Sequence, residues 1–274
     1  MCRVLSVSKS GYYAWCTREE SPRIKALKEH TKEIISIYNS SKRRYGSHKI
    51  HAELSDKGIV TSQNRVARIM KKECIQSIVN KKYKVQTTDS KHTNKISENH
   101  LNRNFNPKKP SVAWVSDITY IDTKQGWLYL TTIIDLFDRK VIGWSLSNNM
   151  TTKDTIMKAW TMAKTNRSAR KGMIFHSDRG VQYTADEFRK ELGKSKVLQS
   201  MSRKGNCWDN AVAESFFKII KSEMINHKYY YSHFQAKIDV FDFIEIWYNK
   251  QRKHSKLGYL TPEQYGKYKY LNVA

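Results

Sequence analysis

The sequence has few acidic residues, no closely paired cysteines and no long hydrophobic run. Its 274 residues include 25 Asp and Glu against 50 Lys and Arg, which gives a formal net charge of +25. No apolar run approaches the roughly eighteen residues that a membrane-spanning helix requires, and residues 1–9 are too polar for a signal peptide. The four cysteines form no C-x-x-C pair, which fits a reducing compartment better than a disulfide framework. We therefore expect a soluble cytoplasmic protein that does not span a membrane.

The excess of positive charge favours a polyanionic partner. An excess of this size creates a field that attracts nucleic acid or, as the competing partner, an anionic membrane. No basic amphipathic helix with a strong apolar face is evident, which disfavours the membrane. The charge is densest in the amino-terminal part, with net +15 over residues 1–110 and net +10 over residues 111–274. DNA or RNA is thus the expected partner.

Two histidines and a cysteine raise the question of a zinc site. His48 and His51 are spaced as H-x-x-H, and Cys74 follows them. A fourth ligand at a suitable spacing is missing. The favoured interpretation is a helix face that carries two histidines.

Residues 47–72 have the pattern of two short helices. Ser47 is a candidate N-cap for a helix through Asp56, Gly58 supplies a stop, and Ser62 can cap a second helix to about residue 72. The basic residues of the second helix share one side: Arg65, Arg68 and Lys72. The pattern is that of a helix-turn-helix, and an ordinary helical hairpin with a solvated basic face is the open alternative. The net charge favours DNA binding.

Residues 77–111 are polar and basic and contain little that could bury a face. They are predicted to form a linker, which either tracks a phosphate backbone or is simply solvated. The expected organisation is then a helical, helix-turn-helix-like DNA-binding region (1–76), this basic linker (77–111), an α/β core (112–226) and a helical C-terminal extension (227–274).

From residue 113 the periodicity becomes that of strands. Segments 114–122, 126–135 and 140–146 are rich in β-branched and aromatic residues, and their short connections predict an antiparallel meander. Then follow a helix (151–165), a strand (173–177), a helix (184–192) and a fifth strand (196–201). This order predicts an α/β layer fold around one mixed sheet of five strands with flanking helices.

Three acidic residues of this core form a candidate metal site. Asp117 lies in the first predicted strand, Asp178 closes the fourth, and Glu214 lies near the start of a predicted helix, with thirty-five residues between the last two. Such an oxygen-only donor set suits Mg²⁺. Two cations roughly 3.5–4 Å apart would relieve the repulsion between the carboxylates and flank one phosphodiester. Each acid alone is more often a cap or a surface ion pair, but the three together favour a metal site.

The helix that bears Glu214 also carries cations. Glu214, Lys218 and Lys221 have the spacing i, i+4, i+7 and share one face, so that the two lysines are expected to hold a phosphate backbone. Apolar residues occupy the other face: Val212, Phe216, Ile219 and Ile220.

The loop before this helix, residues 202–210, is polar and has no periodicity. Asp209 or Asn210 is predicted to cap the helix, and Trp208 either packs against the helix start or stacks on a base. Two residues before Asp178, His176 either orients that acid or contacts phosphate, or it is a core histidine.

An amphipathic helix is predicted over residues 234–248 near the end of the chain. Its aromatic face consists of Phe241, Phe243, Ile244, Trp247 and Tyr248. A basic, hydrogen-bonding cluster follows at residues 248–254 and includes Arg252 and His254. A turn at Gly258 and a cap at Thr261 are predicted beyond it.

Several stretches resemble one known family. The triad Asp117, Asp178 and Glu214 resembles the D,D-35-E triad of the retroviral integrase superfamily. The flanking segments narrow the resemblance to the second-frame transposases of bacterial insertion sequences: Tyr45-Gly46, Trp114–Tyr120, His176–Tyr183, Ser202–Phe217, Tyr248–His254 and Leu257–Glu263. The resemblance covers nearly the whole chain, and no residue of the triad is missing. The zinc-binding amino-terminal domain of retroviral integrases has no ligand set here.

The resemblance implies an RNase H-like core in which the first and fourth strands lie side by side and bring Asp117 next to Asp178. It implies Mg²⁺ as cofactor, for which Mn²⁺ can substitute, and a transposase reaction: cleavage at the transposon ends, then attack of the freed 3′-hydroxyl on another phosphodiester. Lys221 matches a basic position that contacts end DNA in related integrases. The expected DNA contacts are Lys218, Lys221, Arg203, Lys204, Asn206, Trp208, Asn210, Arg65, Arg68, Lys72, Arg252 and His254.

The resemblance also implies partners. They are the terminal inverted repeats of the transposon, target DNA, further copies of the chain in a homo-oligomer on DNA, and the product of an upstream frame to which such chains are fused by frameshifting. Association with the bacterial nucleoid is expected. Two other functions are weighed against transposition: a non-catalytic DNA-binding repressor derived from a transposase, and an RNase H-like nuclease that cuts without joining.

Overall fold

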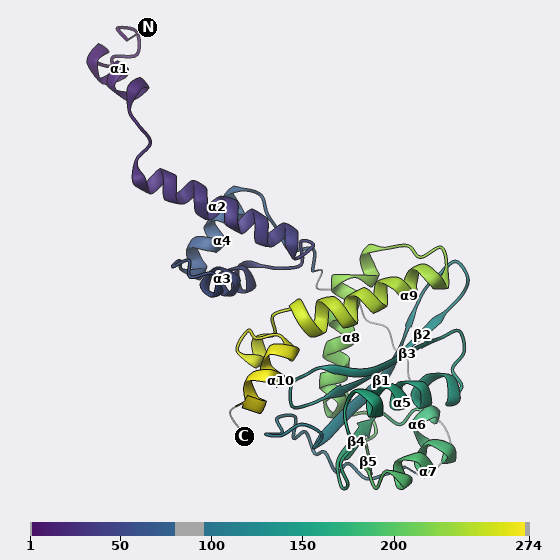
Figure 1. The fold of residues 1–274 in the computed structure, drawn as a ribbon. Coiled ribbons are helices and arrows are strands. Elements are labelled where there is room, and N and C mark those ends of the chain that lie inside the picture. The colour runs from purple at the N-terminus through teal and green to yellow at the C-terminus, as the bar shows by residue number, and fades with distance from the viewer. Residues whose placement is uncertain (1, 80–95, 272–274) are drawn as a thin grey trace. The chain divides into compact units, whose positions relative to one another are not determined.

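The structure, a computed structural model, describes residues 2–79 and 96–271 (Figure 1). The chain divides into two compact units, residues 1–78 and 79–274. Each unit is considered by itself below.

Unit 1 is helical over its described residues. Its helices are α1 (Lys9–Thr17), α2 (Pro22–Ser40), α3 (Ser47–Asp56) and α4 (Gln63–Lys72). α2 packs against both α3 and α4. The buried apolar side chains between these three helices come from each of them: Ile34, Ile37, Ile50, Leu54, Val66, Ile69 and Met70. This arrangement confirms a small all-α region before the sheet.

The helix ends of the α3–α4 pair follow the sequence closely. The Ser62 hydroxyl accepts a hydrogen bond from the Arg65 N–H at 3.2 Å and caps α4, as predicted. Gly58, at φ +74°, adopts a left-handed conformation just after α3, which glycine tolerates without strain. One detail differs, because Gly46 takes the N-cap position of α3 and Ser47 is its first helical residue. The His51 ring nitrogen Nε2 lies 3.0 Å from the Thr61 carbonyl oxygen, which fits the reading of this histidine as part of a helix face.

Unit 2 is built on a five-stranded mixed sheet. The strands are β1 (Ala113–Ile121), β2 (Leu128–Asp135), β3 (Val141–Ser147), β4 (Ile174–Ser177) and β5 (Leu198–Met201), in the spatial order β3-β2-β1-β4-β5. β1, β2 and β3 are antiparallel neighbours, whereas β4 pairs in parallel with both β1 and β5. The predicted meander and the adjacency of the first and fourth strands are both confirmed.

The helices of unit 2 flank this sheet. They are α5 (Lys158–Asn166), α6 (Val181–Thr184), α7 (Asp186–Lys194), α8 (Ala211–Glu223), α9 (His233–Phe241) and α10 (Pro262–Leu271). π-helical turns precede α5 (Lys153–Met157) and continue α9 (Asp242–Gln251), and short 3₁₀ turns span Cys207–Asn210, Ile225–His227 and Ser255–Leu257. The helix predicted over residues 184–192 is α7, shifted by two residues, and the short helix α6 before it was not predicted. Thr261 caps α10 through a 3.1 Å bond from the Gln264 N–H, as predicted.

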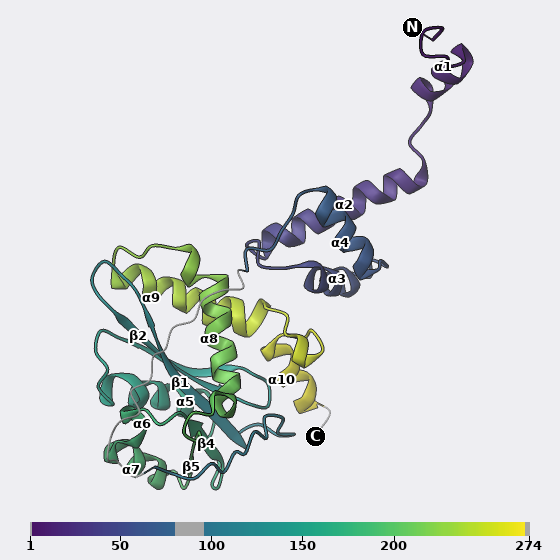
Figure 2. The same cartoon turned by 180° about the vertical axis from the view of Figure 1, so that it is seen from behind.

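The sheet separates two helical layers, which Figures 1 and 2 show from opposite sides. On one face, Trp114 of β1 and Phe175 of β4 both pack edge-on against Trp160 of α5, with ring centroids 5.6 and 5.5 Å apart. On the other face, α8 contacts β1 and β2. Because successive strand residues point to opposite faces, Val115 and Asp117 face away from Trp114 and toward α8.

The segment before β1 differs from its prediction. Residues 96–111 pack on the sheet rather than forming a solvated linker: Leu101 is 2% exposed, and the N–H groups of His100 and Leu101 donate to the Ser200 hydroxyl at 2.9 and 3.1 Å. The remainder of the predicted linker, residues 80–95, lies outside the described residues. Three scattered apolar residues in a polar run, Ile96, Leu101 and Phe105, were too weak a signal to predict this docking.

Candidate active site

The register of β1 and β4 brings the two aspartates together. Val115 pairs with His176, so that continuing this parallel register by two residues sets Asp117 opposite Asp178, just past the end of β4. Both side chains are partly buried. Their nearness follows from the order of the strands and not from any local sequence pattern.

Glu214 approaches from the helix that covers the same face. It lies in the first turn of α8, and α8 contacts β1. The amide of Asn210, which immediately precedes α8, donates to the Ser116 carbonyl oxygen at 3.0 Å. The helix is thus joined to β1 one residue before Asp117, and the three acids of the triad lie around one end of the β1–β4 pair.

The electrostatics of Asp117 reflect this grouping. Burial raises the pKa of Asp117 well above its ordinary value, and the negative charges of Asp178 and Glu214 add to the effect. A hydrogen bond from the Ile118 N–H and the cation of Lys221 act in the opposite direction on this pKa. Glu214 is exposed as a residue, yet partial burial of its carboxyl group raises its pKa too. Mutual repulsion of this kind is what a bound cation would relieve.

The carboxylates are not arranged as a closed ligand cage. Among residues 2–79 and 96–271, no three His, Cys, Asp or Glu side chains are grouped closely enough to hold a metal ion as they stand. The Oδ1 atoms of Asp117 and Asp178 instead accept backbone hydrogen bonds, from Ile118 at 2.8 Å and from Gly180 at 3.0 Å. Carboxylates that lie close together repel one another, and the long side chain of a glutamate has the freedom to turn away from its neighbours.

The two lysines predicted beside Glu214 lie on α8 as expected, but in different surroundings. Lys218 is exposed. The Lys221 ammonium lies 5.0 Å from the centroid of the Tyr120 ring, a cation–π contact. Burial lowers the pKa of Lys221, and the nearby carboxylate of Asp117 opposes that shift. Lys221 is therefore placed beside the acids and Lys218 at the surface.

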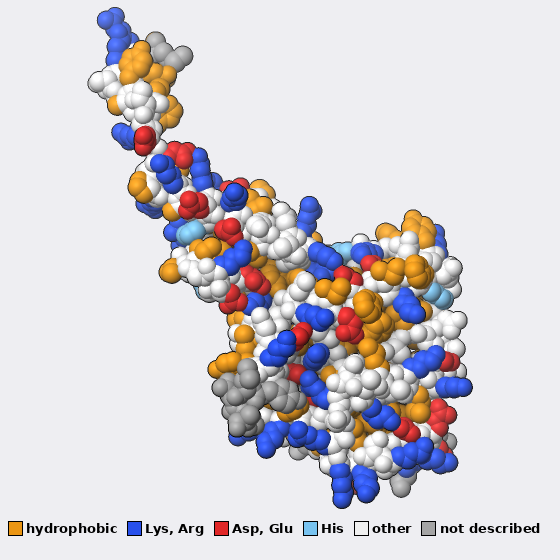
Figure 3. Space-filling view, in the orientation of Figure 1, with side chains coloured by type: hydrophobic (Ala, Val, Ile, Leu, Met, Phe, Trp, Pro, Cys, Tyr) orange, Lys and Arg blue, Asp and Glu red, His pale blue; other side chains and the backbone are white. Residues whose placement is uncertain are grey.

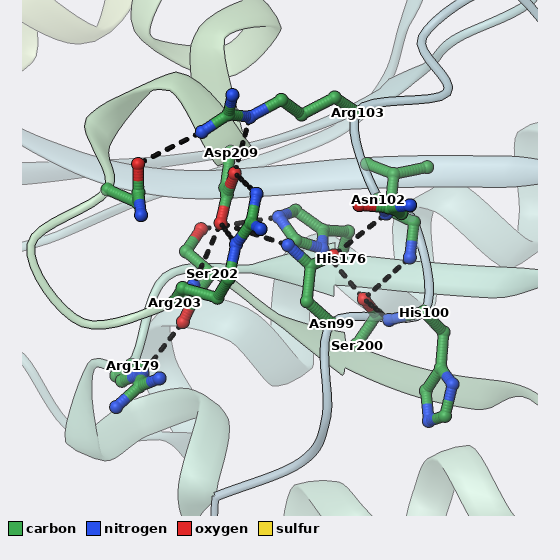
Figure 4. A network of polar contacts seen from close by, with 12 residues as sticks. Asn99, His100, Asn102, Arg103, His176, Arg179, Ser200, Ser202, Arg203 and Asp209 are labelled. Atoms are coloured by element: carbon green, nitrogen blue, oxygen red, sulfur yellow. Dashed lines mark hydrogen bonds and ion pairs between the residues drawn. The ribbon is translucent and has the colours of Figure 1, made fainter.

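The loop before α8 is held by an ion-pair network around the buried Asp209, drawn in Figure 4. Asp209 is fully buried, and the Arg203 guanidinium donates to both of its carboxylate oxygens at 2.8 Å. The Arg103 Nε also donates to it at 2.8 Å, and Arg103 Nη2 donates to Asn206 at 2.9 Å. These contacts hold the pKa of Asp209 well below its ordinary value. The proposed helix cap is thus wrong for Asp209. Arg203 and Asn206 belong to this network, and because Arg203 is exposed and Asn206 half-buried, the prediction that they contact DNA stays a prediction.

Two further predictions for this region also differ. Asn210 is 4% exposed and makes no capping hydrogen bond, so neither the predicted cap nor the predicted DNA contact fits its position. His176 is fully buried, with its ring nitrogens 2.8 Å from the Ser200 hydroxyl and 3.2 Å from that of Ser202. This supports the interpretation of His176 as a core histidine. Burial lowers its pKa to about 4. Lys204 and Trp208, in contrast, are exposed.

The basic cluster after α9 is likewise interior in part. Arg252 is 8% exposed, and its guanidinium makes a bidentate pair with the buried Glu223 of α8 at 2.7 and 3.1 Å. The prediction of Arg252 as a DNA contact is therefore wrong in this structure, because its charge is already neutralised. His254 is half-buried, and its backbone N–H donates to the Leu260 carbonyl oxygen at 3.1 Å. On the predicted aromatic face, Phe241 is 52% exposed while the other four residues are buried.

In unit 1 the basic side of α4, which was predicted to bind DNA, lies largely at the surface. Arg68 and Lys72 are exposed and Arg65 is half-buried, while the apolar side of the helix is buried. Lys and Arg side chains are spread over the visible surface of both units, and acidic ones are fewer (Figure 3). No helix within the described ranges is both long and apolar enough to cross a membrane.

Comparison with known proteins identifies the family. Residues 107–207 and 195–262 match two models of an integrase core domain, and residues 26–83 match a model of an HTH-like domain. The chain is 37% identical over 267 residues to the transposase InsF for insertion sequence IS3A of Escherichia coli (strain K12), which covers 97% of this chain and 92% of the relative. The chain belongs to this family of insertion-sequence transposases.

Two other similarities agree with the assignment. The chain is 37% identical over 262 residues to the insertion element IS600 uncharacterized 31 kDa protein of Shigella sonnei, with 96% of each chain covered. Its fold is similar to a chain in the cryo-EM structure of a simian T-cell lymphotropic virus intasome in complex with the PP2A regulatory subunit B56 gamma. That match has a TM-score of 0.50 at 12% identity and covers 85% of this chain and 74% of the other. The integrase-like fold of this transposase is thereby confirmed.

Sequence reasoning missed several residues that build the site of this transposase. Tyr183 lies beneath the aspartates: its hydroxyl is 2.9 Å from that of Ser116, and burial together with the charges of Asp117 and Asp178 raises its pKa. Arg103 and Asn99 hold Asp209 from a segment predicted to be a linker. No sequence signal pointed to these two residues, because their partner is more than a hundred residues away in the chain.

Proposed function

We propose that this chain cleaves DNA at transposon ends and transfers the freed 3′-hydroxyl to another phosphodiester, with Asp117, Asp178 and Glu214 as the catalytic acids. The observation that carries the proposal is the pairing of β1 with β4, whose register sets Asp117 opposite Asp178 while α8, with Glu214 in its first turn, contacts β1. The raised pKa of Asp117, to which burial, Asp178 and Glu214 all contribute, agrees with this grouping. A partly buried carboxyl group beside two others lowers the stability of the fold, and such groupings are found mainly at functional sites. The membership of the family supports the same chemistry.

The donor set fits a divalent cation. Aspartate and glutamate oxygens are the ligands of Mg²⁺ and Mn²⁺, and no thiolate or imidazole is needed. Asp117 and Asp178 would hold the cation from the sheet, and Glu214 would turn toward them from α8. When bound, such cations activate an attacking oxygen and stabilise the leaving oxygen of a phosphodiester. We propose Mg²⁺ as the natural ion, with Mn²⁺ able to substitute.

The surrounding residues position the DNA. Lys218 at the surface of α8 and Lys221 beside the acids would neutralise backbone phosphates near the scissile bond, and the exposed Lys204 and Trp208 would contact the same strand. In the reaction, hydrolysis of one phosphodiester frees a 3′-hydroxyl. This hydroxyl then displaces a second 3′-oxygen at phosphorus, so that one P–O bond forms as another breaks.

The substrates and partners follow from this reaction. We propose that Arg65, Arg68 and Lys72 of α4 contact the terminal inverted repeats, since they form the basic side of an HTH-like domain. Two ends and a target must be held at once, which calls for several copies of the chain on DNA. The upstream-frame product remains a proposed partner in recognising the ends, and the nucleoid the proposed place of action.

The test uses a transposon-end duplex and measures cleavage and joining in Mg²⁺. Asp117→Asn, Asp178→Asn and Glu214→Gln are each expected to abolish both steps and to leave DNA binding intact. Asp186→Asn is the matched control, because this aspartate has an 84% exposed side chain in α7, away from the triad. Cleavage or joining by any triad variant at the wild-type rate would refute the assignment.

A pre-cleaved end separates the proposal from its alternatives. A non-catalytic repressor would bind the duplex without Mg²⁺ and neither nick nor join it. An RNase H-like nuclease would nick the duplex and fail to join an end that already carries a 3′-hydroxyl. A transposase joins that end to target DNA, and the intact triad favours this outcome.

A further inference from the structure

A side-chain hydrogen bond links the start of the helix that bears Glu214 to the strand that bears Asp117. The Asn210 amide donates to the Ser116 carbonyl oxygen at 3.0 Å. This carbonyl lies one residue beyond the last β1–β4 pair, Val115 with His176, and one residue before Asp117. Asn210 is thus the covalent neighbour of the helix that carries one acid and the hydrogen-bonded neighbour of the strand that carries another.

Asn210 is used unusually for a residue at a helix start. Asparagine at this position ordinarily accepts a hydrogen bond from the second or third helical N–H. Here the side chain makes no such bond, and its Oδ1 atom is buried without a hydrogen-bond partner among the described residues. Asn210 and Glu214 are four residues apart, so that they lie on the same side of α8. The bond to β1 therefore fixes the side of the helix from which Glu214 projects.

Asp209, the residue before Asn210, also anchors the start of α8. Its buried carboxylate accepts five hydrogen bonds: from the Arg203 backbone N–H, Nε and Nη2, from Arg103 Nε and from Asn99 Nδ2, all at 2.8–3.0 Å (Figure 4). Arg103 and Asn99 belong to the segment that leads into β1. Two consecutive residues thus tie the first turn of α8 to separate parts of the fold.

We propose that Asp209 and Asn210 are positioning residues that set the place of Glu214 relative to Asp117, with Asn210 as the decisive link. The proposal rests on the proposed catalytic role of the triad. Without the Asn210 bond the first turn of α8 is free to shift from β1, and a displacement of about 1 Å at a catalytic group can cost on the order of a hundredfold in rate. The predicted role of Asn210 in contacting DNA is replaced by this one.

The first measurement does not depend on activity. Hydrogen exchange of the full-length chain is followed by mass spectrometry in Asn210→Ala and in two controls, Asn249→Ala and Asn166→Ala. The side chains of Asn249 and Asn166 also donate to strand carbonyls, of Val141 at 3.0 Å and of Ile142 at 2.9 Å, but away from the triad. Asn210→Ala is expected to speed exchange over residues 211–215 about tenfold or more, and the controls are expected to leave it unchanged. Unaltered exchange in Asn210→Ala would overturn the proposal.

The second measurement follows the joining of a pre-cleaved end. Asn210→Ala is expected to lower kcat by about 10–100-fold with KM for the DNA end unchanged, whereas both controls keep wild-type kcat despite their lost hydrogen bonds. Equal losses of kcat in all three variants would reduce Asn210 to an ordinary structural residue. If the wild-type chain joins no ends, the proposed function fails, and the exchange data still decide whether Asn210 fixes α8. Should Asn210→Ala not fold, Asn210→Asp, which has the same shape and no donor, replaces it in the exchange comparison.

Discussion

Arg252 and Glu223 form a bidentate ion pair inside unit 2. The Arg252 Nη2 lies 2.7 Å from Glu223 Oε1, and the two side chains are 9% and 2% exposed. The Trp247 indole N–H donates to the same carboxylate at 3.1 Å. The pair joins α8, which bears Glu214, to the chain that follows the π-helical turn after α9. Arg252, which the sequence analysis predicted to contact DNA, thus stabilises the position of α8.

Arg252→Ala is expected to lower the free energy of unfolding by about 3–5 kcal/mol, because it removes the guanidinium that forms a bidentate pair with the buried Glu223 carboxylate. Chemical denaturation measures the loss. Lys256→Ala, which removes an exposed cation from the same segment, should change stability by no more than about 0.5 kcal/mol. A fall in DNA affinity without a fall in stability would restore Arg252 to the DNA-binding surface.

His176 predicts a specific pH dependence of stability. Burial lowers its pKa to about 4 from the ordinary 6.5. Between pH 6.5 and pH 4 the unfolded chain therefore binds a proton at this histidine and the folded chain does not. The free energy of unfolding should therefore fall by about 3 kcal/mol from this group as the pH drops from about 6.5 to about 4. In His176→Asn, which does not titrate, the profile across that window should be flatter. Parallel profiles for the two proteins would contradict the neutral, buried histidine.

The basic side of α4 predicts a salt-dependent contact with DNA. Replacing Arg65, Arg68 and Lys72 together by alanine should weaken binding to transposon-end DNA and reduce the slope of log K against log salt by up to about 2.7, or about 0.9 per phosphate contact. Fluorescence anisotropy at several salt concentrations gives the slope. A control of equal charge replaces the exposed Lys25, Lys28 and Lys32 of α2. Equal effects of the two triple substitutions would mean that only net charge matters.

The charged carboxylate of Asp117 is expected to lower the stability of the metal-free protein. Burial and the neighbouring acids raise its pKa, so its contribution to stability is lost as the pH rises from the unfolded value near 3.8 toward the folded pKa. At neutral pH and in chelator, Asp117→Asn is therefore expected to raise the free energy of unfolding. Thermal and urea denaturation of both proteins test this. A variant less stable than the wild type would show that the carboxylate is paired rather than repelled.

The fold and the triad could be predicted because their signals are local. Strand periodicity and short connections predicted the meander, and the motifs around Asp117, Asp178 and Glu214 indicated the three acids. That Asp117 lies beside Asp178 follows from the pairing of β1 with β4, which only the family resemblance implied. The placement of charged side chains could not be predicted in this way. Whether Arg252 faces solvent depends on Glu223, which only the tertiary structure brings near. Asp209 could not be distinguished from a helix cap without Arg103, which lies 106 residues earlier. Packing that involves distant residues likewise decided the burial of Leu101 and Asn210.

The most direct test of the central claim is a Mg²⁺ or Mn²⁺ titration of the full-length chain without DNA, followed by the melting temperature. If the three acids together hold a divalent cation, the metal raises the melting temperature of the wild type and of Asp186→Asn, and this rise is lost in Asp117→Asn, Asp178→Asn and Glu214→Gln. An equal rise in all five proteins, or none in the wild type, would contradict a metal site built from Asp117, Asp178 and Glu214.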